Sequence, residues 1–209
     1  MFKITCMLNI VIFGKPGSGK GTQASLIKDN YDLVHISTGD VFRKNTSQGT
    51  ELGKIAVKFM SKGELVPDEI TISMLREEIK TFMPCNGFIF DGFPRTILQA
   101  ESLDDLLKSM KLKIDLVVAL DVENKKLVER LLNRGKTSGR SDDQSEEKIN
   151  KRLEEYDNKT KPLINFYKIQ KKFISIDGVG QFSEVTNRLI SIIDSKISWL
   201  KTTLLIMSR

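Results

Sequence analysis

The chain has 209 residues, of which 40% are hydrophobic and 29% are charged. These values are ordinary for a globular protein, and the length suits one large domain or a core domain with small inserts. The sequence has no run of about 18 apolar residues, which excludes a membrane-spanning helix. A net charge of +6 is compatible with either nucleic acid or a small polyanionic ligand.

The two cysteines, Cys6 and Cys85, lie far apart in a chain without an export signal. The apolar run at the N-terminus leads directly into a glycine-rich loop and not into a small-residue cleavage site. Both features predict free thiols in a reducing environment and a cytoplasmic location.

The first half of the chain opens with a predicted buried strand over residues 8–13, a continuous apolar run that Gly14 ends. A helix over residues 20–30 and a short strand over residues 33–37 follow. Residues 38–82 have a helical pattern, with breaks near Gly49, Gly63 and Pro67.

The second half continues the alternation of strands and helices. In chain order we predict strand 88–91, helix 96–110, strand 114–121, helix 125–133, a polar loop over 135–145, a charged helix interrupted at Pro162, strand 172–177 and a last helix from about residue 182. This order predicts an α/β fold with a five-stranded parallel sheet and helices on both faces.

Residues 14–22, GKPGSGKGT, fit the phosphate-loop pattern G-x-x-x-x-G-K between a strand and a helix. The glycines let successive backbone N–H groups wrap a phosphate, and the helix N-terminus adds positive charge. Lys20 is placed to reach the β- and γ-phosphates. A glycine-rich turn that binds nothing is the alternative, and the spacing and context both argue against it.

One position departs from the general phosphate-loop pattern. Gly21 stands where a Ser or Thr usually contacts Mg²⁺. Asp91 ends a predicted apolar strand, so its carboxylate emerges at the sheet edge where ligands bind in such folds. We therefore expect Asp91 to bind Mg²⁺ directly or through water. The alternative is that Asp91 only caps the turn that follows.

Four motifs in order give a more specific indication. They are GKPGSGKGTQ (14–23), ISTGDVFR (36–43), DGFPRT with Gln99 (91–96 and 99), and SGRSDDQSEEKINKRLEEY (138–156). Together they resemble an adenylate kinase over all but the extreme termini. The resemblance implies the P-loop nucleoside monophosphate kinase fold and reversible transfer of a phosphoryl group from Mg-ATP to AMP, giving two ADP.

The resemblance also implies a single domain with two mobile parts. These are a core of residues 1–36, 67–132 and 144–209, an AMP-binding insert of residues 37–66, and a short lid of residues 133–143. The lid has no Cys or His, so we expect Mg²⁺ with ATP and no zinc. Gly135 and Gly139 are expected to give the lid backbone freedom. The implied partners are ATP, AMP and ADP, without nucleic acid or membrane, and the implied state is a monomer.

Site residues follow from the same resemblance, by motif. ATP would contact Gly17, Ser18, Gly19, Lys20, Gly21, Thr22, Arg130, Arg134 and Gly180. AMP would contact Thr38, Arg43, Glu64, Leu65, Val66, Gly92, Phe93, Pro94, Arg95, Gln99, Arg140 and Arg152. The catalytic charges would be Lys20, Arg95, Arg134, Arg140 and Arg152.

The residue chemistry supports this reading independently. The AMP phosphate is largely dianionic near neutrality because its second pKa is about 6. Transfer then needs alignment and charge stabilisation more than a general base. A site rich in Lys and Arg also accounts for the positive charge of the chain. We interpret the single histidine, His35, as structural, and expect Lys15 to extend into solvent.

Three other classes of protein fit the sequence less well. A UMP/CMP kinase is disfavoured because such enzymes usually have Ala and Asn where this chain has Thr38 and Thr96. A nucleic-acid-dependent ATPase would need interleaved basic and aromatic residues, which the sequence lacks. An inactive nucleotide-binding scaffold is disfavoured because Lys20, Asp91 and Arg95 are all present.

The C-terminal segment carries an apolar stripe at helical spacing: Val185, Leu189, Ile193, Ile197, Leu200 and Leu204. It continues past the usual family end. Either the last turns fray, or Ile197, Leu200 and Leu204 pack on the core or on a partner subunit.

Overall fold

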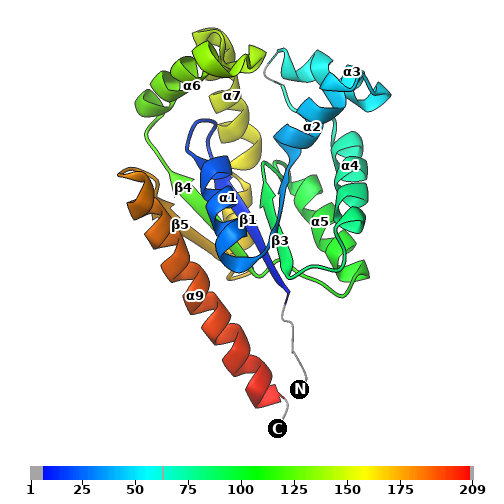
Figure 1. The fold of residues 1–209 in the computed structure, drawn as a ribbon, viewed down its shortest axis with the longest axis vertical. Helices are drawn as coiled ribbons and strands as arrows, with labels where there is room; N and C mark the ends of the chain where they lie inside the picture. Colours follow the sequence, from blue (N-terminus) through cyan, green and yellow to red (C-terminus); the bar gives the residue numbers. More distant parts are fainter. Residues whose placement is uncertain (1–6, 63, 208–209) are drawn as a thin grey trace.

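The computed structural model describes residues 7–62 and 64–207 and has an α/β architecture (Figure 1). Five parallel strands form one sheet in the order β2-β3-β1-β4-β5. The strands are β1 (Leu8–Gly14), β2 (Val34–Ser37), β3 (Gly87–Asp91), β4 (Leu116–Asp121) and β5 (Phe173–Asp177). The predicted fold class is therefore confirmed.

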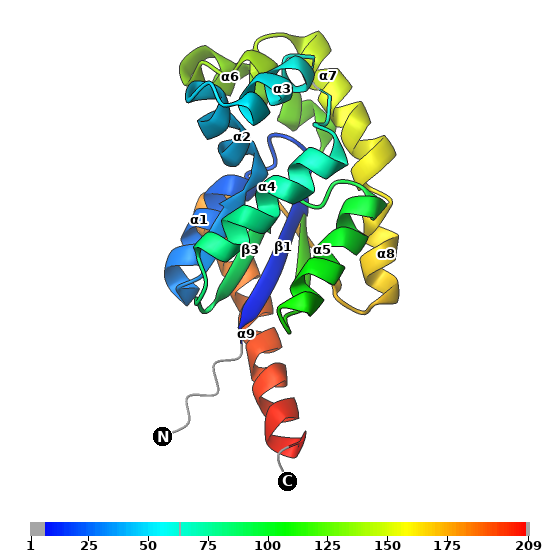
Figure 2. The same ribbon diagram turned by 90° about the vertical axis from the view of Figure 1, so that its right-hand side faces the viewer.

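Helices cover both faces of the sheet, as Figure 2 shows for α4, α5 and α8 on one side. The helices are α1 (Lys20–Tyr31), α2 (Thr38–Ser47), α3 (Glu51–Met60), α4 (Asp68–Thr81), α5 (Ile97–Ser109), α6 (Asn124–Ser138), α7 (Glu146–Glu155), α8 (Leu163–Ile169) and α9 (Phe182–Met207). A 3-10 turn, η1 (Ser141–Asp143), follows α6, and a π-helical turn, η2 (Tyr156–Thr160), follows α7. The interruption predicted at Pro162 is confirmed, since α8 begins at the next residue.

The central strand β1 is buried along its whole length and packs against helices on both sides. Successive side chains of a strand point to opposite faces. Val11 and Phe13 therefore join the cluster that includes α4, α5 and α8, whereas Ile10 and Ile12 join the cluster that includes α1 and α9. This two-sided burial explains the continuous apolar run in the sequence, and it fixes the position of the loop that follows Gly14.

The carboxyl ends of the strands face two helical pairs at the top of Figure 1. One pair is α2 and α3, built on a small cluster of Phe42, Ala56, Val66 and Met74. The other is α6 and α7, built on Val122, Leu127, Leu131, Ile149 and Leu153. The strand order reverses direction at β1, and ligands bind at such a switch point in open α/β sheets.

The prediction of a loop over residues 135–145 is wrong for most of that range. Helix α6 continues to Ser138, and η1 occupies Ser141–Asp143. Gly139 adopts the left-handed conformation (φ +64°) that ends α6. Gly135 allows a close approach, because a Cβ there would collide with the Asp143 carbonyl.

Two further expectations are tested in part. No helix in the described part of the chain is long and apolar enough to cross a bilayer. Cys85 is a free thiol, as predicted, whereas Cys6 lies outside the described residues. Gly63, one of the predicted helix breaks, also lies outside them.

The C-terminal stripe packs on the protein's own core at least as far as Leu200. Val185, Leu189 and Ile193 are buried, Leu200 is 7% exposed, and Ile197 is partly buried against the same cluster. Fraying before Leu200 is therefore excluded. The side chain of Leu204 lies outside the described part of the structure.

We expect Leu200→Ala to lower the free energy of unfolding by about 2–3 kcal/mol, because it removes buried apolar volume from this cluster. Truncation after Ser195 should lower the melting temperature further, since it also removes Ile197. Circular dichroism, followed during urea denaturation for the first effect and during heating for the second, measures both. Lys201→Ala, at an exposed neighbouring position, is the control. An unchanged melting temperature after truncation would contradict the packing described above.

Candidate functional site

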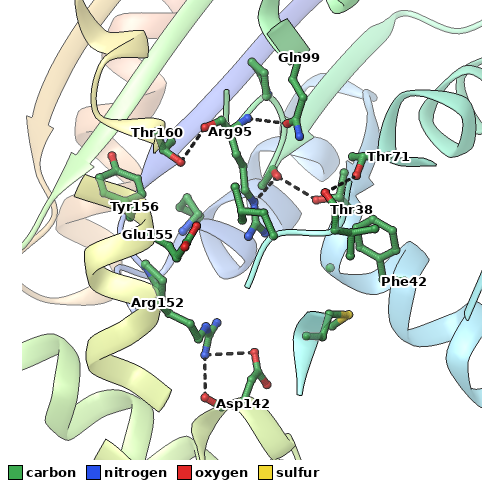
Figure 3. Close-up of a pocket in the computed structure, with 18 of the residues that line it drawn as sticks. Thr38, Phe42, Thr71, Arg95, Gln99, Asp142, Arg152, Glu155, Tyr156 and Thr160 are labelled. Atoms are coloured by element: carbon green, nitrogen blue, oxygen red, sulfur yellow. Dashed lines mark hydrogen bonds and ion pairs between the residues drawn. The ribbon is translucent and has the colours of Figure 1, made fainter. Parts of the chain in front are cut away.

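A cleft opens at the carboxyl ends of β1 and β3, between the α2–α3 pair and helix α7 (Figure 3). Its wall is formed by side chains and backbone from six segments of the chain. The lining residues are Ile12, Phe13, Gly14, Pro16, Lys20, Thr38, Gly39, Phe42, Arg43, Met60, Glu64, Leu65, Val66, Thr71, Gly92, Pro94, Arg95, Gln99, Asp142, Arg152, Glu155, Tyr156 and Thr160. The sequence-predicted phosphate-loop lysine thus shares one cleft with most of the predicted acceptor residues.

The phosphate loop has the backbone geometry that its glycines predict. Gly17 and Gly19 have φ of +84° and +93°, which favours glycine. Lys20 begins α1, and its Nζ donates hydrogen bonds to the carbonyls of Gly14 (2.7 Å) and Lys15 (3.1 Å). Burial lowers the pKa of Lys20 to about 8, against the opposing effect of the Asp91 carboxylate. The loop therefore holds a cation whose charge an anionic ligand would stabilise.

The expectation for Lys15 was wrong. Its Nζ does not extend freely into solvent but lies 2.7 Å from Asp157 Oδ2 and 2.9 Å from Asn124 Oδ1. The side chain is only 22% exposed. The partner residues are more than 100 positions away in sequence, so no local pattern could reveal them. Lys15 thereby ties the phosphate loop to the start of α6 and to the π-helical turn η2.

Asp91 ends β3 beside the phosphate loop and is 9% exposed. Its Oδ2 lies 3.6 Å from His35 Nε2 and would lie 3.3 Å from a Cβ added at Gly21. Burial raises the pKa of Asp91, but the His35 imidazole and the Lys20 charge outweigh this effect and keep the pKa below its usual value. The carboxylate thus occupies the space next to the position where a Ser or Thr usually stands. The sequence did not anticipate the contact between His35 and Asp91.

Arg95 is held from several directions. Its Nε donates to the Gly92 carbonyl (2.7 Å), and its own carbonyl accepts from the Thr160 hydroxyl (3.1 Å). Burial and the nearby charge of Arg152 lower the pKa of Arg95. The guanidinium therefore lines the cleft in a fixed place before any ligand is bound.

Two arginines are fixed by a pair of carboxylates that sequence reasoning had treated only as part of a motif. Asp143 is fully buried and accepts two bonds from Arg134, from Nε at 2.6 Å and from Nη2 at 3.1 Å. Arg152 Nη1 lies 2.5 Å from Asp143 Oδ1 and 3.1 Å from Asp142 Oδ2. Burial raises the pKa of Asp143, but its arginine partners lower it further than burial raises it. The predicted lid is therefore anchored to α7 by ion pairs.

Arg43 lines the cleft, whereas Arg140 lies outside the described lining but near enough to feel the charge of Arg43. Arg43 pairs with Asp40 on α2. Arg140 follows α6, and burial together with the charges of Arg43 and Arg134 lowers its pKa. Arg140 is half-buried. Among the described residues, its guanidinium has no carboxylate in an ion pair.

Thr38 and Gln99 are buried polar residues in the wall of the cleft. The Thr38 hydroxyl donates to the Gly92 carbonyl (2.9 Å). Gln99 Oε1 accepts from the backbone N–H of Arg95 (2.8 Å), and Gln99 Nε2 donates to Asp68 Oδ1 (2.5 Å). Asp68 was absent from the predicted site, and its only sequence signal was a position at a helix start.

The remaining predicted residues divide into three groups. Glu64, Leu65 and Val66 line the cleft as expected. Phe93 is 1% exposed and belongs to the core, so it contributes packing and does not line the cleft. Arg130 and Thr22 are exposed, and Gly180 lies in the β5–α9 connection. These last three lie outside the described lining of the cleft.

Of the phosphate loop, Gly14, Pro16 and Lys20 line the cleft, whereas Gly17, Ser18, Gly19 and Gly21 do not. Gly17 and Ser18 pack inward, and the buried Ser18 hydroxyl has no hydrogen-bond partner among the described residues. Tyr156 and Thr160 in η2 line the cleft but were missed by the sequence analysis. A π-helical turn has no sequence signature, although such turns are frequent at functional sites.

Comparison with known proteins decides the family. A family model described as adenylate kinase matches residues 12–172. The chain belongs to the adenylate kinase family. It is 54% identical to the adenylate kinase of Flavobacterium johnsoniae over 189 residues, which cover 90% of this chain and 100% of the relative.

More distant members of the family agree. The chain is 47% identical to the adenylate kinase of Bacteroides thetaiotaomicron, over 90% of this chain and 99% of the relative. It is 46% identical to that of Leptospira biflexa, over 88% and 98%. As a member of the adenylate kinase family, the chain is an ATP:AMP phosphotransferase.

The lowered pKa of Lys20 predicts proton uptake when ATP binds. At pH 8 about half of the free enzyme carries a neutral Lys20, and the negative phosphates raise that pKa. Binding at pH 8 should therefore take up about half a proton, and affinity should fall as the pH rises above 8. Calorimetry in buffers with different ionisation enthalpies measures the uptake.

Lys20→Arg is the control, because a guanidinium stays protonated in both states. It should bind ATP at pH 8 without this uptake. Equal binding enthalpies in all buffers for the unaltered protein, or equal uptake by Lys20→Arg, would show that Lys20 is not the group that titrates.

Proposed function

We propose that AMP binds in the cleft and that ATP binds across the phosphate loop beside it, so that the transferred phosphoryl group passes between Lys20 and Arg95. The observation that carries this proposal is the shared cleft of the phosphate-loop lysine, the arginines and the polar pair Thr38 and Gln99. The reaction is the reversible conversion of ATP and AMP into two ADP.

On the donor side, the backbone N–H groups of residues 17–22 hold the β- and γ-phosphates of ATP. Lys20 exchanges its bonds to two loop carbonyls for bonds to phosphate oxygens. Arg130 and Arg134 approach from α6, and Gly180 contacts the adenine of ATP through its backbone. The burial of Lys20 supports its role, because a desolvated cation interacts more strongly with an anion.

Asp91 fits a magnesium ion that arrives with ATP. It offers a hard carboxylate ligand beside the phosphate loop, at the end of β3. The neighbouring Gly21 leaves room for that carboxylate where a larger side chain would crowd it. Bound Mg²⁺ would neutralise phosphate charge, and Asp91 would hold it directly or through water. No zinc is included in this proposal.

On the acceptor side, Arg43, Arg95, Arg140 and Arg152 surround the phosphate of AMP. The base lies against Thr38, Gln99 and the segment of residues 64–66, with the backbone of residues 92–94 beneath it. In-line transfer needs the two phosphates aligned and the charge on the equatorial oxygens stabilised. The arginines are held by hydrogen bonds before the substrates bind, so they can both align the phosphates and stabilise that charge.

The cleft offers no free carboxylate to act as a general base, among the residues that the structure describes. Glu64 pairs with Lys151, Asp142 with Arg152, and Glu155 with Lys159, at 2.9, 3.1 and 2.9 Å respectively. The AMP phosphate already carries its negative charge and needs no base. This agreement favours phosphoryl transfer to a phosphate over transfer to a neutral hydroxyl.

The two mobile parts remain proposals. Residues 37–66, with α2 and α3, act as the AMP-binding insert, and residues 133–143 act as a lid that excludes water from the transferring phosphoryl group. We also retain from the sequence the predictions of a monomer, of a cytoplasmic location and of no nucleic acid or membrane partner.

The assigned acceptor site predicts strong preference for AMP over CMP, UMP and GMP. A site whose buried polar groups match one base leaves those groups unpaired with another, and such mismatches reduce kcat/KM by about 10²-fold or more. A coupled assay that compares the four acceptors at fixed Mg-ATP measures the preference. Comparable kcat/KM with CMP or UMP would contradict the assignment of Thr38 and Gln99.

Arg140→Ala should lower kcat by about 10²-fold or more, by analogy with other arginines that stabilise phosphoryl transfer. Its melting temperature should be unchanged or slightly higher, since the free protein loses a repelled charge. Steady-state kinetics beside a melting curve test both expectations. Arg76→Ala, at an exposed position of α4, is the control. Loss of stability in proportion to activity would show instead that Arg140 has a structural role.

A further inference from the structure

Asp68 lies behind the wall of the cleft and contacts two residues at the start of α5. Its Oδ1 accepts a hydrogen bond from Gln99 Nε2 at 2.5 Å, and its Oδ2 accepts one from the Thr96 hydroxyl at 2.9 Å. Asp68 is not among the described residues that line the cleft. Its hydrogen bonds connect Asp68 to the cleft by way of Gln99, which lines it.

The two contacts of Gln99 allow only one orientation of its amide group. The Asp68 carboxylate can only accept, so it must face the Gln99 NH₂ group. The backbone N–H of Arg95 can only donate, so it must face the Gln99 oxygen. In the reversed orientation the Gln99 oxygen would face the Asp68 carboxylate, and the Gln99 NH₂ group would face the Arg95 N–H. Gln99 is 2% exposed, so water cannot relieve that mismatch.

Thr38 is restricted in the same way. Its hydroxyl hydrogen is donated to the Gly92 carbonyl at 2.9 Å, so toward the cleft it can only accept. Gln99 keeps one N–H and one lone pair after its two bonds. The wall therefore presents an acceptor at Thr38 and, at Gln99, a donor and an acceptor whose positions Asp68 helps to determine.

This pattern complements one edge of a purine and opposes another. A 6-aminopurine presents an amino donor beside a ring-nitrogen acceptor, whereas a 6-oxopurine presents a carbonyl acceptor beside a ring N–H. We propose that Asp68 is a positioning residue for base selection, which holds Gln99 in the orientation that accepts the 6-amino edge and rejects the 6-oxo edge. The inference rests on the proposed function, in which the AMP base lies against Thr38 and Gln99.

The test compares kcat/KM for AMP with kcat/KM for IMP, two acceptors that differ only at this edge. Asp68→Ala should reduce the AMP-to-IMP ratio about tenfold or more, mainly through a higher KM for AMP, because one of the two hydrogen bonds that orient the Gln99 amide is then lost. KM for ATP should stay within about twofold, since the phosphate loop is untouched. Glu69→Ala removes the same charge from the same turn of α4 at an exposed position, and should leave the ratio unchanged.

Two further variants separate hydrogen bonding from general effects. Asp68→Asn keeps an oxygen that can accept from Gln99, and should retain most of the preference for AMP. In a Gln99→Leu background, Asp68→Ala should cause no further change in the ratio, because the group it positions is gone. An equal change in both backgrounds, or an Asp68→Asn variant as impaired as Asp68→Ala, would overturn the inference.

The outcomes also distinguish this inference from the proposed function. Unaltered protein that uses AMP and IMP equally would contradict the proposed reading of the base itself. Unaltered protein that prefers AMP, with the same ratio in Asp68→Ala, would contradict the role of Asp68 alone. If Asp68→Ala does not fold by its melting curve, Asp68→Ser carries the same test, since a serine side chain is too short to reach Gln99.

Discussion

Mutual repulsion among the cations in and around the cleft is the constraint on which the site depends. Each charge depresses the pKa of its neighbours, as with Lys20, Arg95 and Arg140. The protein keeps them together by giving each a local partner: loop carbonyls for Lys20, the Gly92 carbonyl for Arg95, and Asp143 for Arg134 and Arg152. Arg140 is the exception, and its unfavourable surroundings become favourable once anionic phosphates are present.

The π-helical turn η2 connects the parts that must act together. Asp157 in this turn pairs with Lys15 of the phosphate loop, and Thr160 donates to the carbonyl of Arg95 on the acceptor side. An ordinary α-helical turn has a different spacing of side chains, so the extra residue of the π-helix changes their directions. One short segment between α7 and α8 thereby fixes the phosphate loop and Arg95 relative to each other.

The two walls of the cleft also meet directly. Lys151 on α7 pairs with Glu64, which follows α3, at 2.9 Å. Both side chains are substantially exposed, so this ion pair contributes little to stability. The ion pair instead positions two parts of the chain, since it joins the segment expected to bind AMP to the helix that carries Arg152. The same contact occupies the Glu64 carboxylate, which lines the cleft beside the arginines.

The sequence by itself determined the parallel sheet, the phosphate loop and the family, because these depend on local patterns. An apolar run that ends at Gly14, followed by glycines at fixed spacing and Lys20, specifies strand, turn and helix without any distant contact. The same holds for the carboxylate that ends β3, whose place at the sheet edge follows from the strand before it.

Only the tertiary structure decided which side chains meet across the chain. Lys15 and Asp157 are 142 positions apart, and Asp68 and Gln99 are 31 apart. The extra turn of α6 also depends on tertiary contact, since Arg134 reaches Asp143 across it. Hydrogen bonds and ion pairs act over about 3 Å, so a partner is defined by position in space. The anchoring of the cations and the orientation of Gln99 are therefore properties of the fold that no local pattern encodes.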